Sequence, residues 1–112
     1  LIGDGELSIH PNIHPHYRAL VMQWQGRALR YIQKSIGIVP GTLLHYHHGP
    51  KKSRGYWSRW KILTETQYNP ATDLKPDWQG LHQLVVENDR QIQLRRLMQR
   101  YFRGRDEDSN IV

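Results

Sequence analysis

The sequence predicts an α+β fold that is mostly helical, with about three helices and one or two short edge strands. Two stretches, 15–35 and 88–103, repeat apolar residues at the three- and four-residue spacing of a helix with one buried face. Two shorter stretches, 42–47 and 80–85, alternate in the way of short strands. The helical stretches are the longer ones, so helix should dominate the fold.

The composition is that of a small globular protein. The chain has 112 residues, of which 38% are hydrophobic and 23% charged, and this suits one domain with a modest core. We divide it into a Pro- and Gly-rich connector at 1–14, a body at 15–104 and an acidic tail at 105–112. Because the sequence begins at Leu1 rather than at methionine, we interpret it as a fragment of a longer protein, with a complete single domain as the alternative.

The charge and the missing residue types limit the possible functions. The net charge of +6 favours an anionic partner such as nucleic acid, a nucleotide diphosphate or a membrane surface. There is no cysteine, which excludes disulfides and thiolate metal sites. No apolar run approaches the length of a membrane span and nothing resembles a signal peptide, so we expect a cytoplasmic protein without a membrane partner.

The first helix is predicted over 15–35. His14 suits the cap position, because Pro15 fits the first helical position, where a missing N–H costs nothing. Gly37 should end the helix in a left-handed conformation. The apolar residues form one stripe: Tyr17, Leu20, Val21, Trp24, Ala28, Tyr31 and Ile32. Of these, we expect Leu20, Trp24 and Ala28 to face the core.

The stretch 41–60 brings together histidines, lysines and arginines, which can bind metal ions or anions, and it contains no carboxylate. If 42–47 is a strand, His45 and His47 share one face, about 7 Å apart at the backbone, and both imidazoles can bind one metal ion. A turn at Gly49 follows, with cations that suit a metal-bound phosphate or diphosphate: Lys51, Lys52 and Arg54. The alternative is a solvated basic loop beside partly buried histidines.

Three further elements complete the prediction. A second helix is expected over 54–67, and one helical turn should open with Asn69 as its cap, followed by proline. Asn88 and Gln91 have the spacing of a capping box, which should begin a helix that runs to Arg103. The apolar stripe of that helix comprises Leu94, Leu97, Met98 and Tyr101, with Ile92 and Phe102 at its border.

Three runs of the chain carry a resemblance to a known family: VPGTLLHYHHGPKKSRGYWSRWKIL, YNPATDLKPDWQGLHQL and RRLMQRYFRGRDEDS. Together they resemble the C-terminal part of bacterial and phage glycosyltransferases of family 2, which have the type A nucleotide-sugar-binding fold. The residues that match the central motif are Pro40, Gly41, Thr42, His45, His48, Gly49, Arg54 and Arg59, with Tyr56 at a shifted spacing. His47 stands where the family usually has tryptophan, so the resemblance favours His45 and His48 over His47 as metal ligands.

The resemblance implies the C-terminal portion of a larger α/β fold of the GT-A type, acting as a metal-dependent glycosyltransferase on a nucleoside diphosphate sugar. It implies Mn²⁺ or Mg²⁺ held in part by His45 and His48, with His47 as the alternative. It implies diphosphate contacts from the cations of the central run: Lys51, Lys52, Arg54 and Arg59. No Asp-x-Asp motif is present, so the catalytic residues are unknown, the partner is an upstream catalytic domain, and the chain alone should be inactive.

Two other classes of function fit the same composition. A small basic nucleic-acid-binding module would use the cationic helix faces and the aromatic residues for phosphate contact and base stacking. A non-catalytic interaction domain would need no ligand. Salt-sensitive binding of DNA or RNA would favour the first of these, whereas binding of uridine or guanosine diphosphate with Mn²⁺ would favour the glycosyltransferase.

Overall fold

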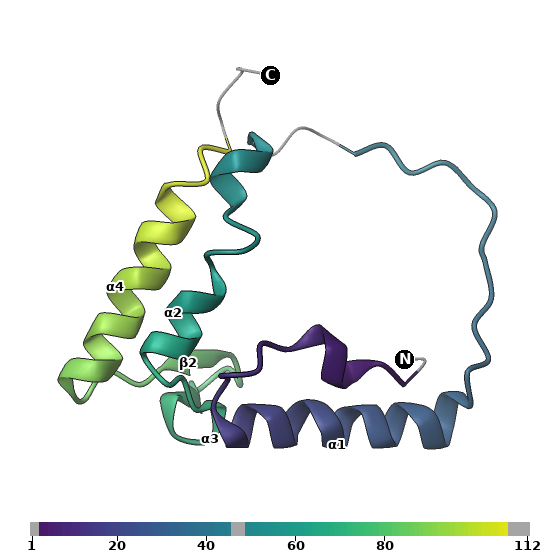
Figure 1. The fold of residues 1–112 in the computed structure, drawn as a ribbon, viewed down its shortest axis with the longest axis horizontal. Coiled ribbons are helices and arrows are strands. Elements are labelled where there is room, and N and C mark those ends of the chain that lie inside the picture. Colours follow the sequence, from purple (N-terminus) through teal and green to yellow (C-terminus); the bar gives the residue numbers. More distant parts are fainter. Residues whose placement is uncertain (1–2, 46–48, 108–112) are drawn as a thin grey trace.

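The computed structural model describes residues 3–45 and 49–107. Helices dominate, and the one sheet in these residues has two antiparallel strands, so the α+β, mostly α prediction is confirmed (Figure 1). In chain order the elements are η1 (Gly5–Ser8), α1 (Pro15–Ile32), η2 (Lys51–Arg54), α2 (Trp60–Glu65), α3 (Pro70–Asp73), β1 (Leu74–Pro76), β2 (His82–Leu84) and α4 (Asp89–Arg103). The helices α2 and α4 pack together, while α1 packs on η1 and α3.

Helix α1 begins as predicted and ends earlier. His14 caps it, because Nδ1 of His14 accepts a hydrogen bond of 3.1 Å from the backbone N–H of His16. At the other end, Gln33 and Lys34 are left-handed, with φ of 53° and 61°, and the helix stops at Ile32 instead of residue 35. The prediction that Gly37 ends the helix is therefore wrong. The backbone N–H of Gln33 already closes the last turn on the carbonyl of Leu29, at 3.1 Å.

The apolar stripe of α1 is only partly buried. Ala28 is buried as predicted, but Leu20 and Trp24 are 52% and 50% exposed, so their assignment to the core is wrong. The physical reason is that α1 packs mainly on η1 and α3 among the described elements, which leaves part of the stripe uncovered. Trp24 instead contributes to a shallow hollow with Tyr68, Pro70 and Leu74.

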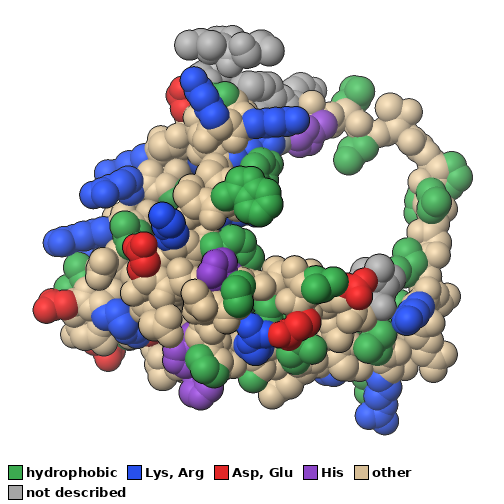
Figure 2. Space-filling view, viewed as in Figure 1, with side chains coloured by type: hydrophobic (Ala, Val, Ile, Leu, Met, Phe, Trp, Pro, Cys, Tyr) green, Lys and Arg blue, Asp and Glu red, His purple; other side chains and the backbone are tan. Residues whose placement is uncertain are grey.

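The segment from residue 33 to residue 45 has no regular secondary structure, so the strand predicted at 42–47 is absent from its described part. Ile38, Val39 and Leu43 are more than 90% exposed. A strand needs a neighbour for its backbone N–H and C=O groups, and no strand in the described ranges pairs with this segment. The segment instead encloses an open window beside α1 (Figures 1 and 2).

The predicted helix at 54–67 is divided by a glycine. Gly55 has φ of +52°, which L side chains rarely adopt, and a Cβ there would lie 2.8 Å from Oγ of Ser58. The chain therefore forms the short helix η2 before this glycine, a turn after it, and then α2 from Trp60 to Glu65. The basic residues at 51–54 consequently lie on a separate short element outside α2.

The remaining elements follow the sequence prediction closely. Asn69 caps α3, accepting a hydrogen bond of 3.0 Å from the N–H of Ala71, and Oδ1 of Asn88 caps α4, accepting one of 2.9 Å from the N–H of Gln91. Strand β2 lies inside the predicted range 80–85, but its partner is β1, with Leu74 opposite Leu84. Leu94 on α4 is fully buried between the packed elements.

A buried carboxylate joins α3 to α4, and its arginine partner also bonds to the residue that ends α2. Asp73 has no exposed surface and accepts hydrogen bonds from the backbone N–H of Asn69 at 2.8 Å, from Nε2 of Gln91 at 3.0 Å and from both terminal nitrogens of Arg90. Arg90 also donates to the carbonyl of Thr66 at 3.0 Å. The centre of this fold is therefore polar as well as apolar, and it is held by one ion pair.

Candidate functional site

The residues from Gly49 to Arg59, here called the basic turn, lie against the end of α4. Gly49 is buried with φ of +84°, and a Cβ at this position would overlap the carbonyl oxygen of Arg105. Only glycine permits this conformation together with such a close backbone approach. The hydroxyl of Tyr101 on α4 also donates a hydrogen bond of 2.9 Å to the carbonyl of Arg54. The basic turn is thus fixed to the helix at both of these points.

Arg54 holds the shape of the basic turn from within. Its Nη2 donates to the carbonyl of Gly49 at 3.1 Å, and its Nη1 donates to the hydroxyl of Tyr56 at 3.1 Å. The hydrogen bond from Arg54 lowers the pKa of Tyr56 below its ordinary value, and the charges of Arg54, Arg59 and Lys51 add to this effect. The lowered pKa indicates a positive potential around the phenol. Arg54 is accordingly a positioning residue for the turn.

Two lysines and a tryptophan form the open side of the basic turn. Lys51 and Lys52 are exposed, and Trp57 is 94% exposed. They border a shallow groove of about 380 Å³ whose lining contains no acidic residue; the remaining lining residues are Gly55, Tyr56 and Ser58. Within residues 3–45 and 49–107, no ion pair involves either lysine. Both ammonium groups are therefore available to an anion beside an exposed indole ring.

The basic turn and the residues after α4 each contain a buried donor that has no acceptor among the described residues. The Nε atoms of Arg54 and Arg105 are buried, and neither has a hydrogen-bond partner in the described part of the chain. A buried N–H without an acceptor is costly, so this end of the molecule contains more donors than the described residues can satisfy.

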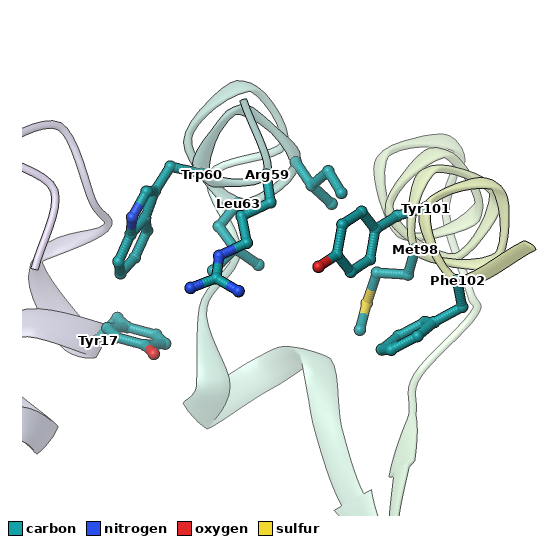
Figure 3. Close-up of a pocket in the computed structure, with 8 residues that line it drawn as sticks. Tyr17, Arg59, Trp60, Leu63, Met98, Tyr101 and Phe102 are labelled. Carbon is teal, nitrogen blue, oxygen red and sulfur yellow. The ribbon is translucent and has the colours of Figure 1, made fainter. Parts of the chain in front are cut away.

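Arg59 belongs to a different hollow. Its guanidinium lies 5.0 Å from the centre of the Tyr56 ring, and its side chain extends into a pocket of about 290 Å³ between α1, α2 and α4 (Figure 3). Tyr17 and Trp60 line one side of this pocket, and Met98, Tyr101 and Phe102 line the other. The pocket lining has no carboxylate or imidazole, so it offers apolar packing without an acid–base pair. Of the four predicted diphosphate contacts, Lys51 and Lys52 line the groove, whereas Arg54 and Arg59 lie beside it.

The predicted metal ligands are only partly described. His45 is exposed at the end of the segment that precedes the basic turn, and His47 and His48 lie outside the described residues. Among the residues that the structure describes, no group of three or more His, Cys, Asp or Glu side chains could hold a metal ion. The described residues thus contribute a single candidate ligand from the predicted set and do not form a complete metal site.

Trp57 is the residue that the sequence interpretation missed. It lies within the helix predicted over 54–67, but Gly55 interrupts that helix and places Trp57 in a turn, where it lines the same groove as two lysines. The usable signal is the interleaving of aromatic and cationic residues after a glycine, which is typical of surfaces that bind nucleotides or nucleic acids.

Within the described ranges, no helix is long and apolar enough to cross a membrane. Comparison of the chain with protein-family models, with curated proteins and with solved structures finds no match. The residues of the basic turn and the resemblance of its motif are therefore the basis for assigning a function.

Proposed function

We propose that this chain forms one wall of the active site of a metal-dependent glycosyltransferase and binds the diphosphate of a nucleoside diphosphate sugar. The observation that supports this most directly is the acid-free groove in which Lys51 and Lys52 lie beside the exposed Trp57. Two ammonium groups match the charge of a diphosphate, and an exposed indole ring is a stacking surface for a base. The motif resemblance at 40–59 supplies the reaction class.

In the proposed reaction, the bond between the sugar carbon and the diphosphate oxygen breaks while a bond from that carbon to an acceptor oxygen forms. The diphosphate leaves with the bonding electron pair, and the acceptor proton passes to a base. Lys51 and Lys52 would stabilise the negative charge that develops on the leaving diphosphate. We propose that an upstream catalytic domain supplies the base, because the described part of the groove contains no carboxylate or imidazole.

A divalent cation, Mn²⁺ or Mg²⁺, belongs to the same proposal. When bound, such an ion acts as a Lewis acid on the diphosphate oxygens. The described residues do not fit a complete site, since they offer His45 without two further ligands. His48, with His47 as the alternative, and the upstream catalytic domain would have to provide the remaining donors.

The diphosphate contact can be tested by titrating the chain with uridine diphosphate and with guanosine diphosphate, using tryptophan fluorescence and calorimetry. Each lysine should contribute about 1 kcal/mol in this exposed groove, so K51Q/K52Q should weaken binding roughly tenfold or more. The matched control K61Q/K75Q removes the same charge from two exposed lysines outside the groove and should change affinity less than about twofold. Equal affinities of the two double variants would refute the groove as the diphosphate site.

The metal ligand can be tested separately through the effect of Mn²⁺ on these affinities. If His45 is a ligand, Mn²⁺ should tighten uridine diphosphate binding to the longer protein that includes the upstream domain and to its His47→Ala variant, but not to its His45→Ala variant. The opposite pattern would show that His47 is the ligand and would contradict the assignment of His45. K51Q/K52Q provides the control, because it should weaken binding whether or not the metal is present.

A further inference from the structure

The outer face of α4 is a second cationic surface, separate from the basic turn. Arg95, Arg96, Arg100 and Arg103 are all exposed, and after Asp89 the helix contains no acidic residue. In the described part of the molecule, none of these four arginines makes an ion pair. Figure 2 shows Lys and Arg side chains projecting from the side of the molecule that α4 forms. We call these four residues the arginine face.

The arginine face borders two adjoining hollows. One, of about 510 Å³, is lined by Arg96, Arg100 and Arg103 together with Gln99 and Gly104. The other, of about 600 Å³, lies between α4 and β2. Its polar lining residues are His82, Gln83, Arg95, Gln99 and Arg103, and its apolar ones are Leu84, Val86, Met98 and Phe102. Arg103 and Gln99 line both hollows, which makes the surface continuous along the helix.

We infer that the arginine face binds single-stranded nucleic acid. Arg96 and Arg100 are four residues apart on α4, a rise of about 6 Å, so their guanidinium groups can contact neighbouring phosphates of one strand. Phe102 is 58% exposed within the second hollow, where its ring can stack on a base. The cations therefore match a phosphate backbone, and the aromatic ring lies where a base of the same strand would reach it.

The neighbouring side chains favour nucleic acid over an anionic membrane. Gln83, Gln99 and His82 add hydrogen-bonding groups that can contact base edges or sugars. A helix that lies in a membrane surface buries its own apolar face in the lipid, whereas the apolar face of α4 is directed into the protein, where Leu94 is fully buried. Phe102 is the one large apolar side chain of α4 that is more than half exposed.

The experiment measures binding of fluorescein-labelled dT20 and U20 by anisotropy between 50 and 300 mM NaCl. With four arginines on phosphates, the logarithm of affinity should fall with the logarithm of salt with a slope of about −3. Replacing all four by glutamine should weaken binding at least tenfold and remove most of that slope. The matched control R27Q/R30Q/K34Q/K61Q makes the same change in net charge elsewhere and should retain most of the affinity and the slope.

Two further variants test base stacking on Phe102 and the independence of the arginine face from the basic turn. F102A should lose affinity about tenfold with an unchanged salt slope, because stacking does not depend on counterion release. K51Q/K52Q should retain oligonucleotide binding even though its affinity for uridine diphosphate is weakened, so the two proposed sites can be tested independently. Circular dichroism shows whether each variant keeps its helix content.

Three results would overturn the inference. The first is an equal loss of affinity in the arginine variant and in the matched control, which would indicate non-specific attraction by net charge. The second is an absence of binding by the wild-type chain at 50 mM NaCl. The third is binding of phosphatidylglycerol vesicles at the same affinity as dT20 with the same dependence on the four arginines, which would assign the face to anionic membranes.

Discussion

Asp73 is the residue through which α3 and α4 are joined. Burial alone would raise the pKa of its carboxyl group, but the hydrogen bonds from Arg90, from the N–H of Asn69 and from Gln91 outweigh burial and hold this pKa well below its usual range. The charge of Arg90 acts in the same direction. The carboxylate is thus stabilised in its ionised form, and its partners come from α4 and from the residue that caps α3.

Asp73→Asn should lower the free energy of unfolding by about 2–3 kcal/mol, because Arg90 and Gln91 lose a charged acceptor at a buried position. Since the pKa of Asp73 is lowered on folding, its stabilisation is complete above the unfolded value near 4 and is lost as the pH falls below it. Urea unfolding at pH 7 and pH 3 would therefore show a smaller difference between wild type and variant at pH 3.

The control for this experiment is Asp4→Asn, which makes the same charge change at an exposed residue whose side chain caps nothing. It should alter stability by less than about 0.5 kcal/mol. If the two substitutions had the same effect at pH 7, Asp73 would not be the junction of these helices.

Gly49 is a second position that requires a particular residue, because its backbone conformation and the nearby carbonyl of Arg105 leave no room for a side chain. Gly49→Ala adds a Cβ that overlaps the carbonyl of Arg105 at a φ of +84°, so it should destabilise the contact between the basic turn and α4 by at least about 1–2 kcal/mol. Affinity for uridine diphosphate should fall with it, because Arg54 is bound to the carbonyl of Gly49.

Gly37→Ala is the matched control for that substitution, since no heavy atom lies within 4 Å of a Cβ at Gly37 and its φ is not positive. It should leave both thermal stability and nucleotide affinity close to wild type. An unchanged nucleotide affinity in Gly49→Ala would show that docking of the turn on α4 is not needed for the groove.

At the scale of elements, local chemistry determined which predictions succeeded. The starts of α1, α3 and α4 are set by His14, Asn69 and Asn88, whose side chains bond to backbone N–H groups two or three residues away. These interactions can be read from neighbouring residues, so the sequence predicts them well. The end of α1 and the division at Gly55 depend on backbone conformations that apolar periodicity does not encode.

The prediction of a strand at 42–47 failed in the described part of that stretch, because strand formation depends on distant residues. Alternation alone does not make a strand, because the backbone must also pair with a neighbouring strand from elsewhere in the protein. The described part of this stretch has no such neighbour, and the actual sheet pairs β1 with β2.

The candidate site is affected in the same way. The sequence identifies the lysines and His45, but the position of Trp57 and the positioning role of Arg54 require the fold.

The whole molecule is less compact than a domain of its length. The radius of gyration is 17.2 Å, compared with roughly 13 Å for a compact domain of this size. Figure 1 shows the segment at 33–45 running as an extended arc away from the packed helices, and its apolar residues, like several of α1, are exposed. A protein with this much uncovered apolar surface is suited to packing against another domain, as the proposed upstream catalytic domain requires.

The central claim is that the groove of the basic turn binds a nucleoside diphosphate. The most direct test is an NMR titration of the ¹⁵N-labelled chain with uridine diphosphate, following the backbone amides and the indole N–H signals. Binding in the groove predicts shifts at the amides of Lys51, Lys52 and Gly55 and at the Trp57 indole, with the amides of the arginine face unchanged. Shifts confined to α4, or no shifts at millimolar nucleotide, would contradict the claim.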